Sequence, residues 1–222
     1  MSNDFGTYNK AASSNAAERN KVPISEVFVP LLKDSKPGII VELACGTGQH
    51  AAHLASELPN FTFQPTDLDD SSFDAVLYHT KDCANVKAPM VVDATDSNWS
   101  DNVLKTVELY TEVSDKEIAS VLIINMTHIS PFAATLGALR GSSDLLRKDG
   151  LLFIYGPFKR DGKHTSEGNA TFDESLQKQK AQWGYRDIES VIENGKSFGF
   201  GNAEITEMPA NNFVLTMRKQ LL

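Results

Sequence analysis

The sequence predicts an α/β fold in which a mostly parallel sheet carries helices on both faces. Short apolar runs typical of buried parallel strands alternate along the chain with segments of helical spacing, which is the order of a doubly wound sheet. A glycine-rich turn directly follows the first of these runs, in the segment GIIVELACGTGQH at residues 38–50. Near the end of the chain, two further apolar runs lie close enough to pair as an antiparallel hairpin.

The elements are expected in a regular order. A first helix is predicted over 16–32, because its apolar residues recur near helical spacing and Pro23 is tolerated early in a helix. Five strands then alternate with four helices. The strands are predicted at 38–43, 60–64, 88–92, 121–125 and 151–155, and the helices at 49–58, 71–80, 98–112 and 131–147.

The last part of the chain follows a different pattern. Two helical stretches, 173–182 and 187–197, precede apolar runs at 203–208 and 213–218. The sequence PANN separates these two runs and is typical of a turn. We therefore expect a seven-stranded sheet whose last two strands form an antiparallel hairpin.

Length and composition indicate one folded domain. The chain has 222 residues, of which 41% are hydrophobic and 23% charged, and no linker divides it. We expect a flexible polar tail at 1–15 and a single domain over 16–222.

The same bulk properties exclude several classes of partner. A net charge of −8 argues against a broad surface for nucleic acid, which needs clustered Lys and Arg. No window approaches the ~18 apolar residues of a membrane span, and the polar start of the chain is unlike a signal peptide. Two cysteines are too few for a disulfide framework or a zinc site. We expect a cytoplasmic protein without nucleic-acid or membrane partners.

Three acids follow the predicted strands at the edge where open α/β sheets bind ligands. Glu42 ends the first strand, Asp67 follows the second and Asp93 ends the third. Gly46 and Gly48 permit a sharp turn close to a ligand. The helix that begins after them offers free amides and a dipole that favour an anion.

These motifs resemble those of a known class of enzymes. ELACGTGQH is similar to the first motif of S-adenosylmethionine-dependent methyltransferases, with Asp67 in TDLD where the ribose hydroxyls are usually held and Asp93 in VVDATD near the adenine. More closely, AERNKVPI, GTGQHAAHLA, FQPTDLD, NMTHISPF, LLFIYGPF, WGYRD and MPANN resemble, in that order, an uncharacterised methyltransferase-like family whose substrate is unknown. The resemblance spans residues 17–218.

The resemblance implies a Rossmann-like class I methyltransferase fold that binds S-adenosylmethionine and releases S-adenosylhomocysteine. It also implies a set of cofactor-binding residues: Arg19, Asn20, Glu42, Ala44, Gly46, Thr47, Gly48, Gln49, His50, Asp67, Asp93 and Asn125. For Asp67 and Asp93 the alternative is a helix cap or a turn. For Gln49 and His50 it is an exposed helix surface, and for Arg19 and Asn20 a solvated helix start.

Catalytic candidates follow the fourth and fifth strands. His128 in NMTHISPF is a candidate general base, because imidazole titrates near neutrality, and its alternative is a structural histidine in a loop. Tyr155 and Phe158 in YGPF are placed to form a pocket wall, although Tyr155 also fits a core position. His50 and His53 lack an evident acid partner, so no metal site is predicted.

The function favoured is methyl transfer to a small molecule or an exposed protein group. One alternative is a non-catalytic scaffold or regulatory subunit that holds S-adenosylmethionine. Another is an NAD-binding oxidoreductase, since Gly46, Gly48 and Ala51 satisfy the loose dinucleotide pattern. Glu42, Asp93 and the terminal hairpin favour the methyl donor.

Overall fold

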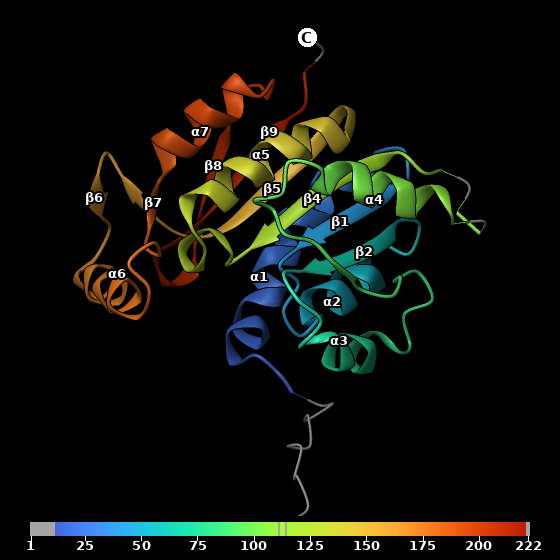
Figure 1. The fold of residues 1–222 in the computed structure, drawn as a ribbon, viewed down its shortest axis with the longest axis horizontal. Coiled ribbons are helices and arrows are strands. Elements are labelled where there is room, and N and C mark those ends of the chain that lie inside the picture. The colour runs from blue at the N-terminus through green and yellow to red at the C-terminus, as the bar shows by residue number, and fades with distance from the viewer. Residues whose placement is uncertain (1–11, 111, 114, 221–222) are drawn as a thin grey trace, which may run out of the picture.

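The protein is built around one twisted sheet covered by helices (Figure 1). The computed structural model describes residues 12–110, 112–113 and 115–220. The main strands lie in the order β3-β2-β1-β4-β5-β9-β8. Their bounds are β1 Ile39–Leu43, β2 Thr62–Asp67, β3 Met90–Val91, β4 Ile118–Ile124, β5 Leu146–Arg160, β8 Glu204–Met208 and β9 Asn212–Arg218.

The pairing of the strands confirms the predicted topology. β1 runs parallel to β2 and β4, and the β2–β3 and β4–β5 pairs are also parallel. β9 is antiparallel to both β5 and β8, which makes the terminal hairpin. Two further strands, β6 (Lys163–His164) and β7 (Arg186–Asp187), pair with the far end of β5. They were not predicted, because two residues are too few to show an alternating pattern.

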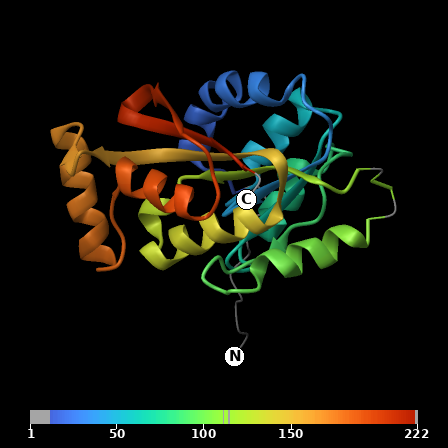
Figure 2. The same cartoon turned by 90° about the horizontal axis from the view of Figure 1, so that it is seen from above.

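Helices cover both faces of the sheet, as Figure 2 shows in the view from above. One face carries α1 (Asn15–Leu32) and α2 (Gln49–Glu57), with α3 (Phe73–Thr80) beside α2. The other carries α4 (Trp99–Glu108), α5 (Phe132–Leu145) and α7 (Ile188–Ser197). A seventh helix, α6 (Glu167–Gln179), lies beyond the end of the sheet near β6 and β7 (Figure 1).

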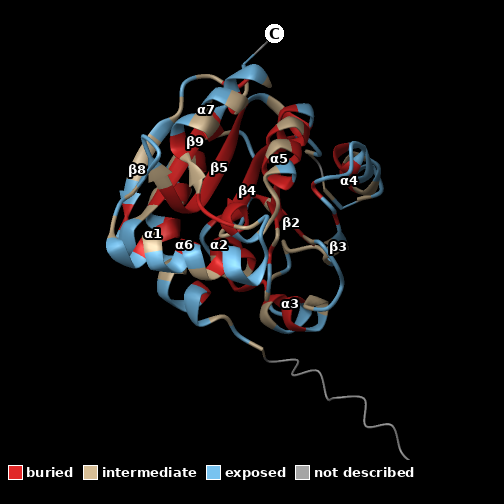
Figure 3. Ribbon diagram, turned by 60° about the vertical axis from the view of Figure 1, so that its left-hand side comes forward, coloured by how far each residue is buried: buried red, intermediate tan, exposed pale blue. Residues whose placement is uncertain are grey.

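Each face of the sheet builds its own apolar core because side chains alternate along a strand. In β1, Ile39 and Val41 pack with residues of α4, α5 and α7, whereas Ile40 packs with residues of α1 and α2. Figure 3 shows the buried strands between helices whose outer surfaces are exposed. Glu42 shares the alternation of Ile40 and is also buried, although it is an acid.

Some predicted bounds are wrong by several residues. β2 covers Thr62–Asp67 rather than 60–64, so Asp67 is its last residue. β3 has two residues rather than five. α4 ends at Glu108 instead of 112. α6 begins at Glu167 instead of 173, because the Ser166 hydroxyl caps it by accepting a bond from the Asn169 amide (3.1 Å).

The beginning of the described chain is anchored to its neighbours. Of the tail predicted for 1–15, residues 1–11 lie outside the described residues. Ser13 and the Ala12 carbonyl contact His79, and α1 begins at Asn15. Pro23 lies in the middle of α1 rather than early in it, so the carbonyl four residues before it, on Arg19, lacks its helical donor. No helix within the described ranges is long and apolar enough to cross a membrane.

Candidate active site

Two adjoining cavities open at the point where the strand order reverses, between β1 and β4. This is where open α/β sheets bind their ligands. The larger cavity, cavity 1, has a volume of about 1050 Å³ and lies toward α1 and α6. The smaller, cavity 2, has about 730 Å³ and lies toward β3 and α5. Ala44, Asp67 and Ile129 line both cavities, so the two form one continuous site.

The loop after β1 passes between the two cavities in an unusual backbone conformation. Ala44, Gly46 and Gly48 have φ values of 56°, 55° and 78°, in the left-handed region. For Ala44 this costs roughly 1–2 kcal/mol, and such strain concentrates at functional sites. A Cβ on Gly46 would meet no atom within 4 Å, whereas one on Gly48 would lie 3.0 Å from Val76 of α3. Gly46 thus leaves space in cavity 1, and Gly48 permits helix packing.

Asp67 and Asp93 both face cavity 2. The Asp67 carboxylate accepts hydrogen bonds from the backbone amides of Gly46 and Leu68, each at 2.7 Å. Burial raises the pKa of Asp67, and these two bonds oppose the rise. Asp93 accepts hydrogen bonds from the amide and the hydroxyl of Thr95 (2.8 and 2.7 Å), as expected for a turn residue. It also lines cavity 2.

Glu42 is a buried acid without a partner. It is 1% exposed, and neither carboxylate oxygen has a hydrogen-bond partner in the described structure. Burial, reinforced by the charge of Asp67, raises the pKa of Glu42 to about 8. A buried carboxyl group of this kind gains from a cationic or N–H donor supplied by a ligand. Glu42 does not itself line either cavity, but its backbone lies two residues before Ala44.

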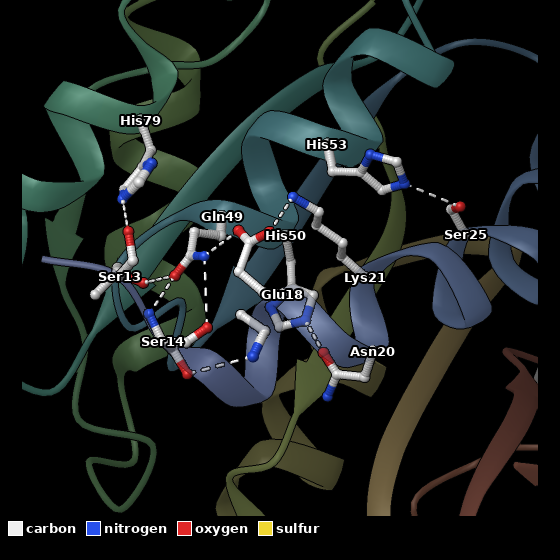
Figure 4. Close-up of polar contacts among 12 residues, drawn as sticks. Ser13, Ser14, Glu18, Asn20, Lys21, Ser25, Gln49, His50, His53 and His79 are labelled. Atoms are coloured by element: carbon white, nitrogen blue, oxygen red, sulfur yellow. Dashed lines mark hydrogen bonds and ion pairs between the residues drawn. The ribbon is translucent and has the colours of Figure 1, made fainter. Parts of the chain in front are cut away.

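Gln49 ties the first turn of α1 to the glycine loop. Figure 4 shows its side chain among Ser14, Glu18 and the neighbouring residues. Gln49 Oε1 accepts bonds from the Ser14 amide (2.5 Å) and the Thr47 hydroxyl (2.6 Å), and its Nε2 donates to Glu18. Gln49 is buried rather than an exposed helix residue. Its side chain holds α1 over cavity 1, and Thr47 lines that cavity.

Asn20 joins α1 to the floor of cavity 1. Its Oδ1 accepts a hydrogen bond from His50 Nε2 at 2.8 Å (Figure 4). Burial, together with the nearby His53 and Lys21, lowers the pKa of His50 to about 4, so this imidazole is neutral at pH 7. Burial raises the pKa of Tyr155, while a hydrogen bond with Asn20 and the charge of Arg19 lower it. These interactions join four residues that line cavity 1 into one cluster: Arg19, Asn20, His50 and Tyr155.

Asn125 and His128 follow β4 at the opposite wall. Asn125 has φ 57°, and its amide donates to the Tyr155 carbonyl (2.9 Å). His128 lies in a short 3₁₀ turn, Thr127–Ile129, and is 6% exposed. Its Nδ1 is buried without a partner, and burial together with the nearby Arg186 lowers its pKa to about 4. His128 is thus a neutral imidazole on the surface of cavity 1.

The structure distributes the predicted residues unevenly. Cavity 1 is lined by Arg19, Asn20, Ala44, Gly46, Thr47, His50, Asp67, Asn125, His128 and Tyr155, and cavity 2 by Ala44, Asp67 and Asp93. Glu42, Gly48 and Gln49 line neither, although all three lie immediately behind the loop. Phe158 was expected in a pocket wall, and this was wrong: its side chain is fully buried in the core. Within the described residues, no group of three or more His, Cys, Asp or Glu is placed to hold a metal.

Other lining residues were missed from the sequence. Asn169 and Phe172 come from α6, and Tyr185 from the segment between α6 and β7. Trp183 lines cavity 2. These positions are far along the chain from the glycine loop, and only the packing of α6 beyond β5 brings them to it. The motifs WGYRD and MPANN, which contain Tyr185 and Asn212, were the one available signal.

Comparison with known proteins places the fold. A sequence family described as a protein of unknown function, DUF938, matches residues 11–219. An O-methyltransferase family protein from Burkholderia thailandensis has a similar structure, with TM-score 0.74, 14% identity, and coverage of 92% of this chain and 56% of that one. Human N-acetylserotonin methyltransferase in complex with SAM is also similar, with TM-score 0.68, 11% identity and coverage of 93% and 53%.

A third similar structure is PigF with SAH, at TM-score 0.69 and 12% identity, covering 91% of this chain and 56% of that one. The chain therefore spans a little over half the length of these three structures. At such identities the likeness shows a shared fold, the Rossmann-like fold of methyltransferases.

Proposed function

The chain belongs to the DUF938 family of unknown function, and from its fold and the geometry of its site we propose that it is an S-adenosylmethionine-dependent methyltransferase acting on a small-molecule acceptor. Structures that share its fold were determined with SAM and with SAH, which supports this choice of cofactor. The observation that carries the proposal is the acidic edge around the glycine loop: Asp67 and Asp93 line cavity 2, and Glu42, buried just behind the loop, has two carboxylate oxygens without a partner in the described structure.

The residues around the glycine loop fit the chemistry of the proposed cofactor. Asp67 and Asp93 in cavity 2 offer carboxylate oxygens to ribose hydroxyls and an adenine amine. Glu42 suits an ammonium group, because an opposite charge would favour its ionised form. The space beside Gly46 and the start of α2 suit a carboxylate. Bound there, S-adenosylmethionine would supply an electrophilic methyl group.

Two residues of cavity 1 are placed to handle the proton of the acceptor. His128 is neutral near pH 7, since its pKa is about 4, and as a weak base it can take a proton only from a strongly acidic group, such as the acceptor as it is methylated. Burial raises the pKa of Tyr155, so its hydroxyl keeps its proton and can donate a hydrogen bond. Methyl transfer asks little more of the protein than alignment of the reactants and removal of this proton.

Isothermal titration with S-adenosylhomocysteine and with NAD tests the proposal. We expect S-adenosylhomocysteine to bind, and Glu42→Gln to weaken this binding by about ten-fold or more, because a charge-assisted hydrogen bond contributes roughly 1.5–3 kcal/mol. Glu57→Gln, an exposed acid at the end of α2, is the matched control and should bind as the wild type. Binding of NAD without S-adenosylhomocysteine would refute the proposal.

The alternative of a non-catalytic scaffold is separated by turnover. Cavity 1 extends from the glycine loop to Phe172 and Asn212, which leaves room for a second ligand and favours an enzyme. Incubation with labelled S-adenosylmethionine and a cell extract should release labelled S-adenosylhomocysteine. A scaffold would bind the donor and release none.

A further inference from the structure

Part of cavity 1 is walled by aromatic side chains. Phe172, Tyr185 and His128 line it, and we call these three residues the aromatic wall. They come from α6, from the segment before β7 and from the turn after β4. None of them was needed to account for cofactor binding. If the proposed function holds, this wall faces the methyl acceptor.

The rings of the aromatic wall are packed against one another. The Tyr185 ring lies 6.0 Å from that of His128 and 6.2 Å from that of Phe172, both edge to face, and Phe172 lies 6.3 Å from His128. Tyr185 is 7% exposed, whereas Phe172 is 46% exposed. A large apolar side chain that lines a cavity and stays half exposed leaves apolar surface for a ligand to cover. An aromatic ring suits such a surface by stacking.

Hydrogen bonds hold the aromatic wall in place. The Tyr185 amide donates to the buried Asp173 carboxylate at 2.7 Å, and Asp173 also accepts from His164 (2.7 Å) and Lys159 (3.0 Å). The Gly184 amide donates to the His128 carbonyl at 3.0 Å. The aromatic wall is therefore preformed, and binding of a ligand would not carry the entropic cost of ordering it.

A second contact fixes the rim above the aromatic wall. Asn169 Nδ2 donates to the carbonyl of Asn211 (3.4 Å) in the PANN turn. Ala210 and Asn211 have φ values of 59° and 55°, so two successive residues without the freedom of glycine adopt the left-handed region. Strain of this kind persists where the surrounding structure over-determines it, commonly at ligand sites. Ala210 and Asn212 line cavity 1 on this side.

Among the described residues, no acid lines cavity 1 at the aromatic wall: the Asp173 carboxylate lies behind Tyr185, outside the lining, and is paired there with Lys159 (3.0 Å). Of its described lining residues, only Arg19 and Asp67 carry a formal charge at pH 7, since the two lining histidines are neutral. Asp67 lies at the junction with cavity 2, where its carboxylate is bonded to the glycine loop. A cationic acceptor would therefore find no lining carboxylate at the aromatic wall, and the attraction of ring faces for a cation is smaller than the cost of removing its hydration shell.

We propose that the methyl acceptor is a small planar aromatic molecule that is neutral or anionic, with its ring against Phe172 and Tyr185. Lysine and arginine side chains, and aliphatic amines, are disfavoured by the same surface. The Nδ2 groups of Asn169 and Asn212 already donate within the protein, so these residues offer their side-chain oxygens to a hydrogen-bond donor on the ring. This inference rests on the proposed function, because it assigns the cavity beside the cofactor to the acceptor.

Matched probe compounds test the inference by binding, without any turnover. The protein is first saturated with S-adenosylhomocysteine, and calorimetry then measures its affinity for 4-hydroxybenzoate, 4-hydroxybenzamide and 4-hydroxybenzylamine, which carry one ring and a negative, neutral or positive substituent. The same three substituents on an indole ring extend the series. A cyclohexane analogue of the amide removes planarity, and a blocked Gly-Tyr-Gly peptide presents the ring as a protein side chain.

We expect the anionic and neutral aromatic probes to bind more tightly than the amine and the cyclohexane analogue. Phe172→Ala should weaken the aromatic probes about five-fold through the loss of stacking. Leu109→Ala removes another exposed apolar side chain, outside both cavities, and should change nothing. Four results would overturn the inference. The amine could bind more tightly than the anionic and neutral probes, or the peptide more tightly than the free aromatic probes. The aromatic probes could bind equally well to the wild type and to the Phe172→Ala variant, or not bind at all.

The two proposals fail in different ways. If S-adenosylhomocysteine does not bind to the wild type, the proposed function fails before any probe is added. If it binds and the probes behave otherwise than expected, only the assignment of the acceptor is wrong.

Discussion

His128 differs from an ordinary surface histidine in its burial and in its unpartnered Nδ1 atom. The sequence left its role open between a general base and a structural loop residue. The structure places it on cavity 1, beside the rings of Phe172 and Tyr185, while its backbone carbonyl accepts a hydrogen bond from the Gly184 amide (3.0 Å). Burial, with the nearby Arg186, lowers its pKa to about 4, which keeps the imidazole neutral across the physiological range and makes it a weak base that takes a proton only from a strongly acidic group.

Replacement of His128 tests this role. We expect His128→Gln to lower kcat about 100-fold, the usual contribution of a general base, with the affinity for S-adenosylhomocysteine unchanged. His53→Gln is the matched control, because His53 contacts Ser25 (3.1 Å) and lines neither cavity. In the wild type the His128 contribution to the rate should be flat from pH 6 to 8 and fall only toward pH 4. An inflection near pH 6.5 that disappears in His128→Gln would contradict this assignment.

The loop between β1 and α2 contains two glycines that serve different purposes. Both have a positive φ, and the sequence suggested one reason for both, a ligand too close for a Cβ. The structure gives that reason only to Gly46, which faces open space. Gly48 is the N-cap of α2 and lies against Val76 of α3. One element therefore combines a binding surface and a packing contact within three residues.

Alanine at each glycine should separate the two purposes. Each substitution costs about 1–2 kcal/mol for the left-handed conformation, and Gly48→Ala adds a steric clash with Val76 at 3.0 Å. We therefore expect Gly48→Ala to lower the free energy of unfolding in urea more than Gly46→Ala. In calorimetry, Gly46→Ala should lose more affinity for S-adenosylhomocysteine. A reversed order in either measurement would show that the assignment of the two glycines is wrong.

For the whole molecule, the buried ionisable groups make stability depend on pH. Glu42 has a pKa of about 8 in the folded protein against an ordinary value of 4.5, so the folded state binds more protons than the unfolded state between these values. Its effect is therefore to lower stability as pH rises through this window. His50 and His128 have folded pKa values of about 4 against an ordinary 6.5, so their effect is to raise stability as pH rises, and it is complete by about pH 6.5.

Above pH 6.5, Glu42 is the only one of these three groups that still changes the stability with pH. We expect the Tm of the ligand-free protein to fall between pH 6.5 and 8, and Glu42→Gln to reduce this fall. Differential scanning calorimetry of the wild type and of Glu42→Gln at several pH values measures this fall in Tm, with Glu57→Gln as the control. An equal fall in wild type and Glu42→Gln would show that Glu42 does not carry an elevated pKa.

At the level of the molecule, the order of elements could be predicted because it depends on local patterns. Apolar runs such as 38–43 and the helical spacing of 16–32 reflect which side of a strand or helix is buried, and that is written in neighbouring residues. The acids Glu42, Asp67 and Asp93 could be predicted together because parallel strands end at one edge of the sheet. The short strands β6 and β7 could not be predicted, since two residues are too few to show an alternating pattern.

From the amino-acid sequence alone, the sheet, its terminal hairpin and the glycine loop at the switch point could be inferred, because each depends on contacts close along the chain or on a regular strand order. Only the folded structure established that Phe158 is core, that Gln49 anchors α1, and that Phe172 and Tyr185 meet His128. Those outcomes depend on how α6 and α1 pack against the sheet, and packing between distant segments leaves no periodic trace in the sequence.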